Sequence, residues 1–264
     1  MKVCTDACLF GAWLSKDQNL LNATTLLDIG TGTGILSLMV AQAFVAKGPA
    51  TQNTNKSTAK PISISAVEIE PTAAAEATRN IQLSPWSKHI QVFNQSLQEY
   101  VSAQVKSSNN LSSDPSSYLS SELSSDYSIN AFDCIFTNPP FFEGDLPSPN
   151  AQKNLAAHST ALPWTTLIEN VKLLLKEDGY YYVLIPAIRA YTMQKLADQN
   201  GLKLEEEVVV YNAAAQKPFR VMQKYKKTAA PILTVTRSNF IIKEKDQSYS
   251  HAFTSLLKDY YLHL

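Results

Sequence analysis

The strongest constraint on the fold is a cluster of glycines between an apolar segment and a helical pattern. Residues 24–29 are mostly apolar or β-branched, and apolar side chains recur with helical spacing from Ile35 onward. Between them lie Gly30, Gly32 and Gly34, three of only eight glycines among 264 residues. Glycine reaches positive φ without strain and lets the backbone approach a ligand closely. The pattern predicts a strand, a tight turn and a helix, which is where α/β sheets bind nucleotides.

Strand-like and helical patterns alternate along most of the chain. Further short apolar runs occur at 62–69, 89–93, 132–137 and 181–185. This alternation predicts one α/β domain over residues 1–264, with a doubly wound, mostly parallel sheet of the seven-stranded type.

The end of the chain shows a different pattern. Residues 202–211 and 231–242 are strand-like and are separated by a basic stretch. We expect an antiparallel strand pair here that closes the sheet.

Two polar segments interrupt the pattern, at about 46–60 and 102–130. The second is rich in serine and poor in large apolar side chains, so it can bury little surface to offset its ordering entropy. We expect both to be insertions, and the second to be mobile.

Charge and cysteine content limit the class of protein. Lysine plus arginine and aspartate plus glutamate both number 23, which excludes a uniformly basic nucleic-acid coat and requires any such contact to be local. Cys4, Cys8 and Cys134 cannot form a closed disulfide set or a four-ligand zinc site, and the histidines lack metal-ligand spacing. No apolar run is long enough for a membrane helix. We expect a cytoplasmic protein without metal or membrane association, whose oligomeric state the sequence leaves open.

The spacing of the glycines distinguishes between cofactors. A dinucleotide fingerprint has the form G-x-G-x-x-G, whereas this segment has the form G-x-G-x-G and follows Asp28. It resembles motif I of S-adenosylmethionine-dependent methyltransferases. The resemblance implies S-adenosylmethionine as cofactor, with Asp28, Gly30, Gly32 and Gly34 among the residues that bind it.

A carboxylate at the end of the second strand is expected to bind the cofactor ribose, because two oxygens match two adjacent hydroxyls. Glu68 occupies that position, and Glu70 lies further into the following turn. The alternative is a solvated acid at the end of a strand.

The segment Asn138-Pro139-Pro140-Phe141 follows the apolar run 132–137. Consecutive prolines make a rigid turn without strand pairing. The Asn138 amide oxygen and a proline carbonyl could hold both N–H groups of a planar amine and direct its lone pair at a methyl donor, while Phe141 stacks on the substrate. The alternative is an ordinary proline-rich turn.

The combination of these motifs resembles that of the amino-methyltransferases that modify adenine N6, guanine N2 or glutamine N5. The resemblance implies a Rossmann-like class I methyltransferase and assigns the catalytic role to residues 138–141. A protein that retained the fold and binds RNA without catalysis is a further alternative.

The two ends of the chain narrow this group. Residues 1–13 and 246–262 resemble the opening and closing segments of the bacterial tRNA1(Val) (adenine(37)-N6)-methyltransferase family. That resemblance implies N6-methylation of adenine 37 in a tRNA anticodon stem-loop, with tRNA-Val as the tRNA that the family name indicates. It also implies that Thr5 and Asp6 border the cofactor pocket and that residues 138–141 bind the adenine.

Three departures from the family pattern bear on these roles. Ser96 replaces an aspartate expected to contact the cofactor adenine, so we expect this contact to pass through water or to be lost. The Ala-Arg pair that the family carries in the loop after residues 138–141 appears here as Ala156-Ala157-His158, so we expect a phosphate or loop contact to be lost. Family members also carry further residues before the segment that begins at Met1, so we expect a truncated or late start.

The basic stretch near the end is the predicted tRNA-binding segment. It contains Lys217, Arg220, Lys224, Lys226 and Lys227, with aromatic residues interleaved and no acid. Basic groups can contact phosphates while aromatic rings stack on unpaired bases. The alternative is a solvated hairpin loop.

Overall fold

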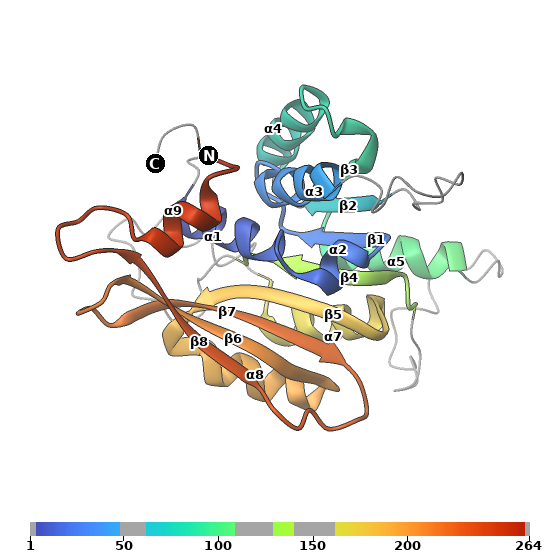
Figure 1. The fold of residues 1–264 in the computed structure, drawn as a ribbon. Coiled ribbons are helices and arrows are strands. Elements are labelled where there is room, and N and C mark those ends of the chain that lie inside the picture. Colours follow the sequence, from blue (N-terminus) through green and yellow to red (C-terminus); the bar gives the residue numbers. More distant parts are fainter. Residues whose placement is uncertain (1–3, 48–61, 109–128, 140–161, 262–264) are drawn as a thin grey trace, which may run out of the picture.

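The computed structural model describes residues 4–47, 62–108, 129–139 and 162–261, which form one sheet with helices on both faces (Figure 1). The strands are β1 (Thr25–Ile29), β2 (Ser63–Glu68), β3 (Ile90–Asn94), β4 (Phe132–Thr137), β5 (Leu175–Pro186), β6 (Leu202–Ala213), β7 (Pro218–Lys227) and β8 (Thr236–Lys243). The α-helices are α1 (Thr5–Leu14), α2 (Gln18–Asn22), α3 (Ile35–Lys47), α4 (Pro71–Gln82), α5 (Leu97–Ser108), α7 (Trp164–Leu174), α8 (Ala190–Gln199) and α9 (His251–Leu257). Two short 3-10 helices are η1 (Ser87–His89) and η3 (Ala187–Arg189).

The strand order is β3-β2-β1-β4-β5-β7-β6-β8. The first five strands in this order are parallel, and β7 runs antiparallel to both of its neighbours. From β1 the chain adds β2 and β3 on one side and then returns to place β4 on the other. This reversal creates a switch point between β1 and β4, where the carboxyl ends of parallel strands leave a crevice.

The predicted fold class is confirmed, but the composition of its antiparallel part needs correction. The basic stretch forms strand β7 and is inserted between β5 and β6. The two runs that we expected to pair with each other correspond to β6 and β8, which run parallel. The basic stretch alternates weakly and is rich in charge, so its sequence did not indicate a central strand.

Alternating side chains of the strands build two cores. Leu26, Ile64 and Phe136 belong to the core that α1, α3 and α9 cover. Leu27, Val67 and Ile135, each an odd number of residues from its counterpart on the same strand, belong to the core under α5, α7 and α8. The two-residue period of a strand therefore determines which helix layer each side chain meets. None of the helices in the described ranges is long and apolar enough to cross a bilayer.

Both predicted insertions lie largely outside the described residues. Helix α3 ends at Lys47, where the first begins, and α5 continues to Ser108, into the start of the second. Val105 is buried against the core, so the first part of the serine-rich segment is a packed helix. The mobility of the rest stays a prediction.

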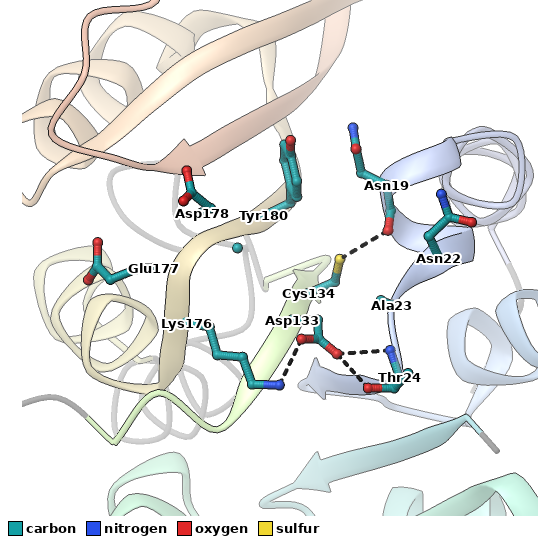
Figure 2. A pocket seen from close by; sticks show the side chains of 11 residues that line it. Asn19, Asn22, Ala23, Thr24, Asp133, Cys134, Lys176, Glu177, Asp178 and Tyr180 are labelled. Carbon is teal, nitrogen blue, oxygen red and sulfur yellow. Dashed lines mark hydrogen bonds and ion pairs between the residues drawn. The ribbon is translucent and has the colours of Figure 1, made fainter. Parts of the chain in front are cut away.

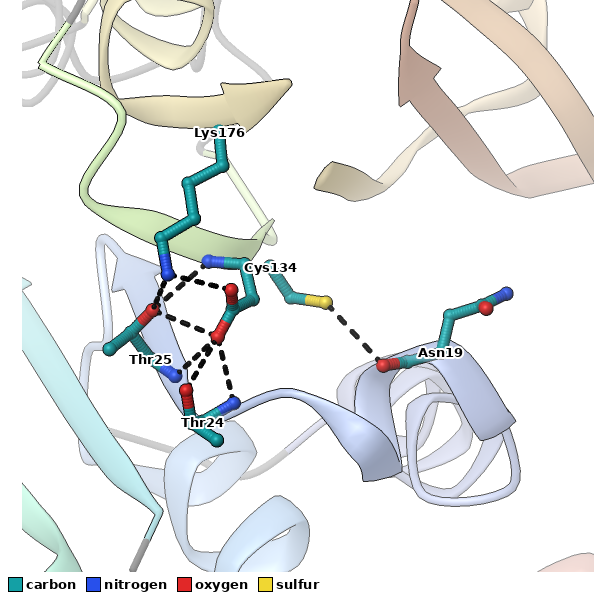
Figure 3. Close-up of polar contacts among 6 residues, drawn as sticks. Asn19, Thr24, Thr25, Cys134 and Lys176 are labelled. Carbon is teal, nitrogen blue, oxygen red and sulfur yellow. Dashed lines mark hydrogen bonds and ion pairs between the residues drawn. The ribbon is translucent and has the colours of Figure 1, made fainter. Parts of the chain in front are cut away.

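The carboxylate of Asp133, at the start of β4, binds the beginning of β1. Its Oδ2 accepts hydrogen bonds from the backbone N–H and the hydroxyl of both Thr24 and Thr25, at 2.8–3.0 Å. Its Oδ1 accepts from Lys176 Nζ at 2.7 Å, and Figure 3 shows these groups converging between the strands. Burial raises the pKa of Asp133, but the hydrogen bonds from Lys176, Thr24 and Thr25 outweigh it and hold the pKa well below its usual range.

We expect Asp133→Asn to lower the free energy of unfolding at pH 7 by about 1.5–3 kcal/mol, because the charge-assisted hydrogen bonds are lost. The folded-state pKa is depressed, so the contribution of the carboxylate is complete above its ordinary pKa of about 4 and disappears as the pH falls further. The difference between wild type and variant should therefore shrink below about pH 4 in urea titrations. Asp198→Asn, which breaks the more exposed pair with Lys203, should have little effect at either pH. A constant difference down to pH 2 would contradict the assigned role.

Candidate functional site at the carboxyl edge of the sheet

The carboxyl ends of the four parallel strands β1 to β4 place several polar residues at one edge of the sheet. Ile29 lies opposite Val67 on one side and Thr137 on the other, and Glu68 lies opposite Asn94. The Thr137 hydroxyl also donates to the Ile29 carbonyl at 2.7 Å. The switch point therefore brings together the glycine turn, Glu68 and Asn138, which follows Thr137.

The glycine turn has the left-handed backbone that its composition predicts. Gly30, Gly32 and Gly34 have φ of 71°, 58° and 84°. A Cβ on Gly30 would meet nothing within 4 Å, whereas one on Gly34 would touch Ala77 of α4 at 3.5 Å. Gly30 thus leaves open space at the edge, and Gly34 allows α3 and α4 to pack closely.

Asp28 lies beneath this turn and is completely buried. Its Oδ2 accepts hydrogen bonds from the hydroxyls of Thr31 at 2.6 Å and Ser37 at 2.7 Å. The carboxylate therefore connects the strand to the turn and to the first part of α3. Asp28 therefore positions the turn in this structure, and its direct contact with a cofactor stays a prediction.

Glu68 connects the second strand to the same turn. Its Oε2 accepts from the backbone N–H of Gly32 at 2.8 Å, and its Oε1 accepts from that of Glu70 at 2.9 Å. A carboxylate has about four acceptor positions, so these two bonds leave capacity for hydroxyl donors. Glu70 instead caps α4 by accepting from Thr72 and Ala73. This difference supports the choice of Glu68 over Glu70.

Sequence reasoning missed two asparagines that organise the edge. The Asn94 side chain donates to the carbonyl of Glu68 at 2.9 Å, and the Asn80 side chain donates to the carbonyl of Thr33 at 3.0 Å. Asn94 ends β3, so its position after an apolar run was the available signal. Asn80 lies within a helix, and its sequence context offers no such signal.

Asn138 follows β4 directly, beside the end of β1. Its Oδ1 is buried and has no hydrogen-bond partner among the described residues. A buried acceptor without a donor is costly, and such an atom is suited to bind a ligand N–H group. Pro139 is also buried. Pro140 and Phe141 lie outside the described residues, as do Ala157 and His158.

Ser96 directly precedes α5 and caps it in a capping box. Its hydroxyl accepts from the Glu99 backbone N–H at 3.2 Å, and Glu99 Oε2 accepts from the Ser96 backbone N–H at 2.8 Å. The serine therefore has a local role as the N-cap of α5. Its contact with a cofactor stays a prediction.

The first turn of α1 reaches the same edge through an ion pair. Arg220 lies opposite Pro186, at the carboxyl end of β5, and its Nε donates to Asp6 Oδ2 at 2.9 Å. Asp6 is thus held at the edge where the cofactor is expected, and Thr5 precedes it in the same helix.

The predicted tRNA-binding stretch does not form one exposed surface. Lys224 is 5% exposed and pairs with Asp17 and Glu205, both at 2.9 Å. Burial lowers the pKa of Lys224, but its hydrogen bonds to both carboxylates outweigh this and raise it.

Lys227 is similarly enclosed, at 7% exposed. Its Nζ donates to the carbonyls of Lys172 and Leu175 and pairs with Glu177. We therefore correct the expectation that Lys224 and Lys227 contact phosphates. If either ammonium moved away to reach a phosphate, the acceptors that it now binds would lose their partner.

Of the other three basic residues, two are also paired with acids and one is exposed. Lys226 pairs with Asp178, and Arg220 pairs with Asp6. Lys217 precedes β7 and is exposed.

A separate cavity of about 300 Å³ opens at the opposite edge of the sheet (Figure 2). Its polar lining includes Asp133, Lys176, Glu177 and Asp178. The three acids are already paired with lysines. None of the predicted site residues lines this cavity. Within the described ranges, no group of three or more histidine, cysteine or acidic side chains could hold a metal ion.

The pKa of Asp28, the buried carboxylate beneath the turn, can be tested through its effect on stability. Burial raises the pKa of Asp28 to about 6, with a further contribution from the negative charge of Glu68, while the hydrogen bonds from Thr31 and Ser37 oppose the shift. Because the folded-state pKa is raised, the folded protein binds this proton more tightly, and the contribution of Asp28 to stability falls as the pH rises from about 4 to about 6.

Asp28→Asn should remove this loss, which we expect to be up to about 3 kcal/mol. Urea titrations at several pH values compare the two proteins. Parallel pH profiles of variant and wild type between pH 4 and 6 would show that Asp28 does not titrate there.

The segments at the two ends of the chain lie side by side, with α9 packed on α1 (Figure 1). Gln42 of α3 also donates to the carbonyl of Asp259 at 2.8 Å. Aromatic rings of the closing segment stack on each other, with Tyr249 and Phe253 centroids 4.4 Å apart. The two segments that carried the family resemblance therefore form one packed unit.

Solved structures show the fold. A predicted O-methyltransferase of Agrobacterium tumefaciens superposes with a TM-score of 0.60 over 96% of this chain and 95% of that chain, at 13% identity. An SAM-dependent methyltransferase of the same organism gives a TM-score of 0.52 over 85% of this chain and 63% of that chain, at 14% identity. The chain therefore has the Rossmann-like methyltransferase fold.

No protein-family model matches the chain. Among curated proteins, a tRNA1(Val) (adenine(37)-N6)-methyltransferase of Dyadobacter fermentans is 32% identical over 263 residues, which are 99% of this chain and 91% of that protein. The protein of the same name from Pseudoalteromonas translucida is also 32% identical, over 99% of this chain and 92% of its own length. With this identity over nearly its whole length, the chain belongs to the tRNA1(Val) (adenine(37)-N6)-methyltransferase family.

Proposed function

We propose that this protein transfers a methyl group from S-adenosylmethionine to N6 of adenine 37 in the anticodon loop of a tRNA, in the cytoplasm. Family membership supports the reaction. The observation that carries the proposal is the buried Oδ1 of Asn138 beside the glycine turn, which has no hydrogen-bond partner in the described part of the chain.

The carboxyl edge fits S-adenosylmethionine in two respects. The backbone at Gly30 is open, so a ligand can approach it closely. Glu68 is held rigidly by two backbone N–H groups and retains acceptor capacity for the ribose hydroxyls. Thr5, Asp6, Gly32, Gly34 and Ser96 complete the proposed cofactor site, and Asp28 supports it from below.

Asn138 is the proposed catalytic residue. The N6 lone pair of adenine is delocalised into the ring and is a weak nucleophile. An acceptor that holds an N6–H group can localise the lone pair and orient it. When bound, S-adenosylmethionine supplies an electrophilic methyl group on a sulfonium. A bond forms from N6 to that carbon as the carbon–sulfur bond breaks, and the extra N6 proton leaves to solvent.

An unpaired base in a loop is the least costly substrate for such a site. Moving a paired base out of a duplex requires unpairing and unstacking energy, which a loop base largely avoids. We propose that Pro139, Pro140 and Phe141 shape the adenine pocket beside Asn138. Thr137 holds the start of this segment through its bond to Ile29.

Asn138→Ala should reduce the rate of methyl transfer by about 10²–10³, as expected when a group that stabilises the transition state is removed. Affinity for S-adenosylmethionine should persist in calorimetry. Transfer of labelled methyl groups to tRNA measures the rate. Asn22→Ala is the matched control, because Asn22 is exposed at the opposite edge of the sheet. Near-normal turnover of the Asn138 variant would contradict its role.

Glu68→Gln should weaken S-adenosylmethionine binding by about 10- to 100-fold, because a charged acceptor of two hydroxyls is lost. Glu70→Gln is the matched control. Glu70 caps α4 and is exposed, so this change should lower the melting temperature while affinity stays the same. Equal affinities of wild type and Glu68→Gln in calorimetry would remove Glu68 from the site.

Substrate class is tested by offering labelled cofactor with separate pools of tRNA, rRNA and release factor. Label in tRNA as N6-methyladenosine supports the proposal. Label in guanine of rRNA or in glutamine of release factor would establish one of the other amino-methyltransferase activities. Failure to bind cofactor would favour an RNA-binding protein without catalysis.

A further inference from the structure

Two large apolar side chains are exposed beside the carboxyl end of β5. Ile188 in η3 is 86% exposed, and Tyr191 in the first turn of α8 is 77% exposed. They are three residues apart, so they lie close together on one side of this segment. Removing such groups from water is favourable, and an exposed tyrosine ring offers a flat surface for stacking.

These side chains lie close to the proposed adenine site. Thr137, which precedes Asn138, lies opposite Val183 of β5. Ile188 follows Val183 by five positions, so the chain can place it no more than roughly 18 Å beyond that pair. Nucleotides next to an adenine bound at Asn138 can span this distance.

The neighbouring strand adds positive charge. Pro186 at the end of β5 pairs with Arg220 of β7, and η3 packs against β7. The exposed Lys217 therefore belongs to the same edge. Neither residues 186–197 nor residues 208–227 contain an acid.

We propose that Ile188, Tyr191 and Lys217 form a docking surface for unpaired RNA, on which a nucleotide flanking the target adenine stacks against Tyr191. This inference rests on the proposed function and locates the tRNA-binding surface of the same site. The surface combines an exposed ring and an aliphatic group with a cation, the pattern by which proteins hold single-stranded nucleic acid. This surface replaces Lys224 and Lys227 as the expected RNA contact, because the charges of these two lysines pair with acids of the protein.

The test compares variants of the full-length chain for binding of a fluorescent tRNA anticodon stem-loop. Tyr191→Ala should raise the dissociation constant by about 5- to 100-fold, the range for loss of one base–aromatic stack. Tyr191→Phe keeps the ring and should bind like wild type. Ile188→Ser should also weaken binding. Lys217→Gln should weaken binding and reduce its dependence on salt concentration, because one phosphate contact is lost.

Leu233→Ser is the matched control for Ile188→Ser. Leu233 is 92% exposed but lies between the end of β7 and β8, at the opposite edge of the sheet. This variant should bind RNA like wild type. All variants should keep their affinity for S-adenosylmethionine, which a general loss of structure would lower.

The outcomes separate this inference from the proposed function. If wild type methylates tRNA and Tyr191→Ala binds the stem-loop equally well, the docking surface is wrong while the proposed function stands. If wild type neither binds nor methylates tRNA, both are wrong. A selective loss of stem-loop binding in Tyr191→Ala, restored in Tyr191→Phe, supports the surface.

Discussion

The alignment of β1 with β4 is the constraint on which the site depends. At the amino edge, Asp133 accepts four hydrogen bonds from Thr24 and Thr25, which holds the starts of the two strands together. At the other edge, this alignment brings Ile29 opposite Thr137. A shift of one residue would turn every side chain of a strand to the opposite core. The same shift would also separate the glycine turn from Asn138.

The carboxyl edge is organised mainly by buried polar groups. Asp28 holds the turn from below, and Glu68 binds its backbone from the neighbouring strand. Asp28 Oδ2 and both oxygens of Glu68 accept hydrogen bonds from groups of the turn and its surroundings, so the turn is shaped before any ligand binds. Such preorganisation lowers the cost of binding, because less ordering is required at that moment.

Charge along this chain serves structure as much as recognition. The lysines of β7 lie between strands that carry acids, and Lys224 pairs with carboxylates from both α2's N-cap and β6. The neutral net charge agrees with this use, since each of the three lysines of β7 pairs with an acid. The surface that we propose for RNA is instead small and consists of an exposed ring, an aliphatic side chain and Lys217.

The sequence alone determined the fold class, the glycine turn, the strand-end acid and the asparagine after β4, because each depends on local pattern and on the rule that parallel strands end at one edge. The resemblance of the two terminal segments likewise indicated the family, which the relatives confirmed. Only the tertiary structure decided which charges are accessible. Burial of Lys224 and Lys227 depends on strands distant in sequence, and no local pattern distinguishes a basic strand that is enclosed from a basic loop that is free. The same holds for Asp28 and Tyr191, whose opposite exposure follows from how the helices pack on the sheet.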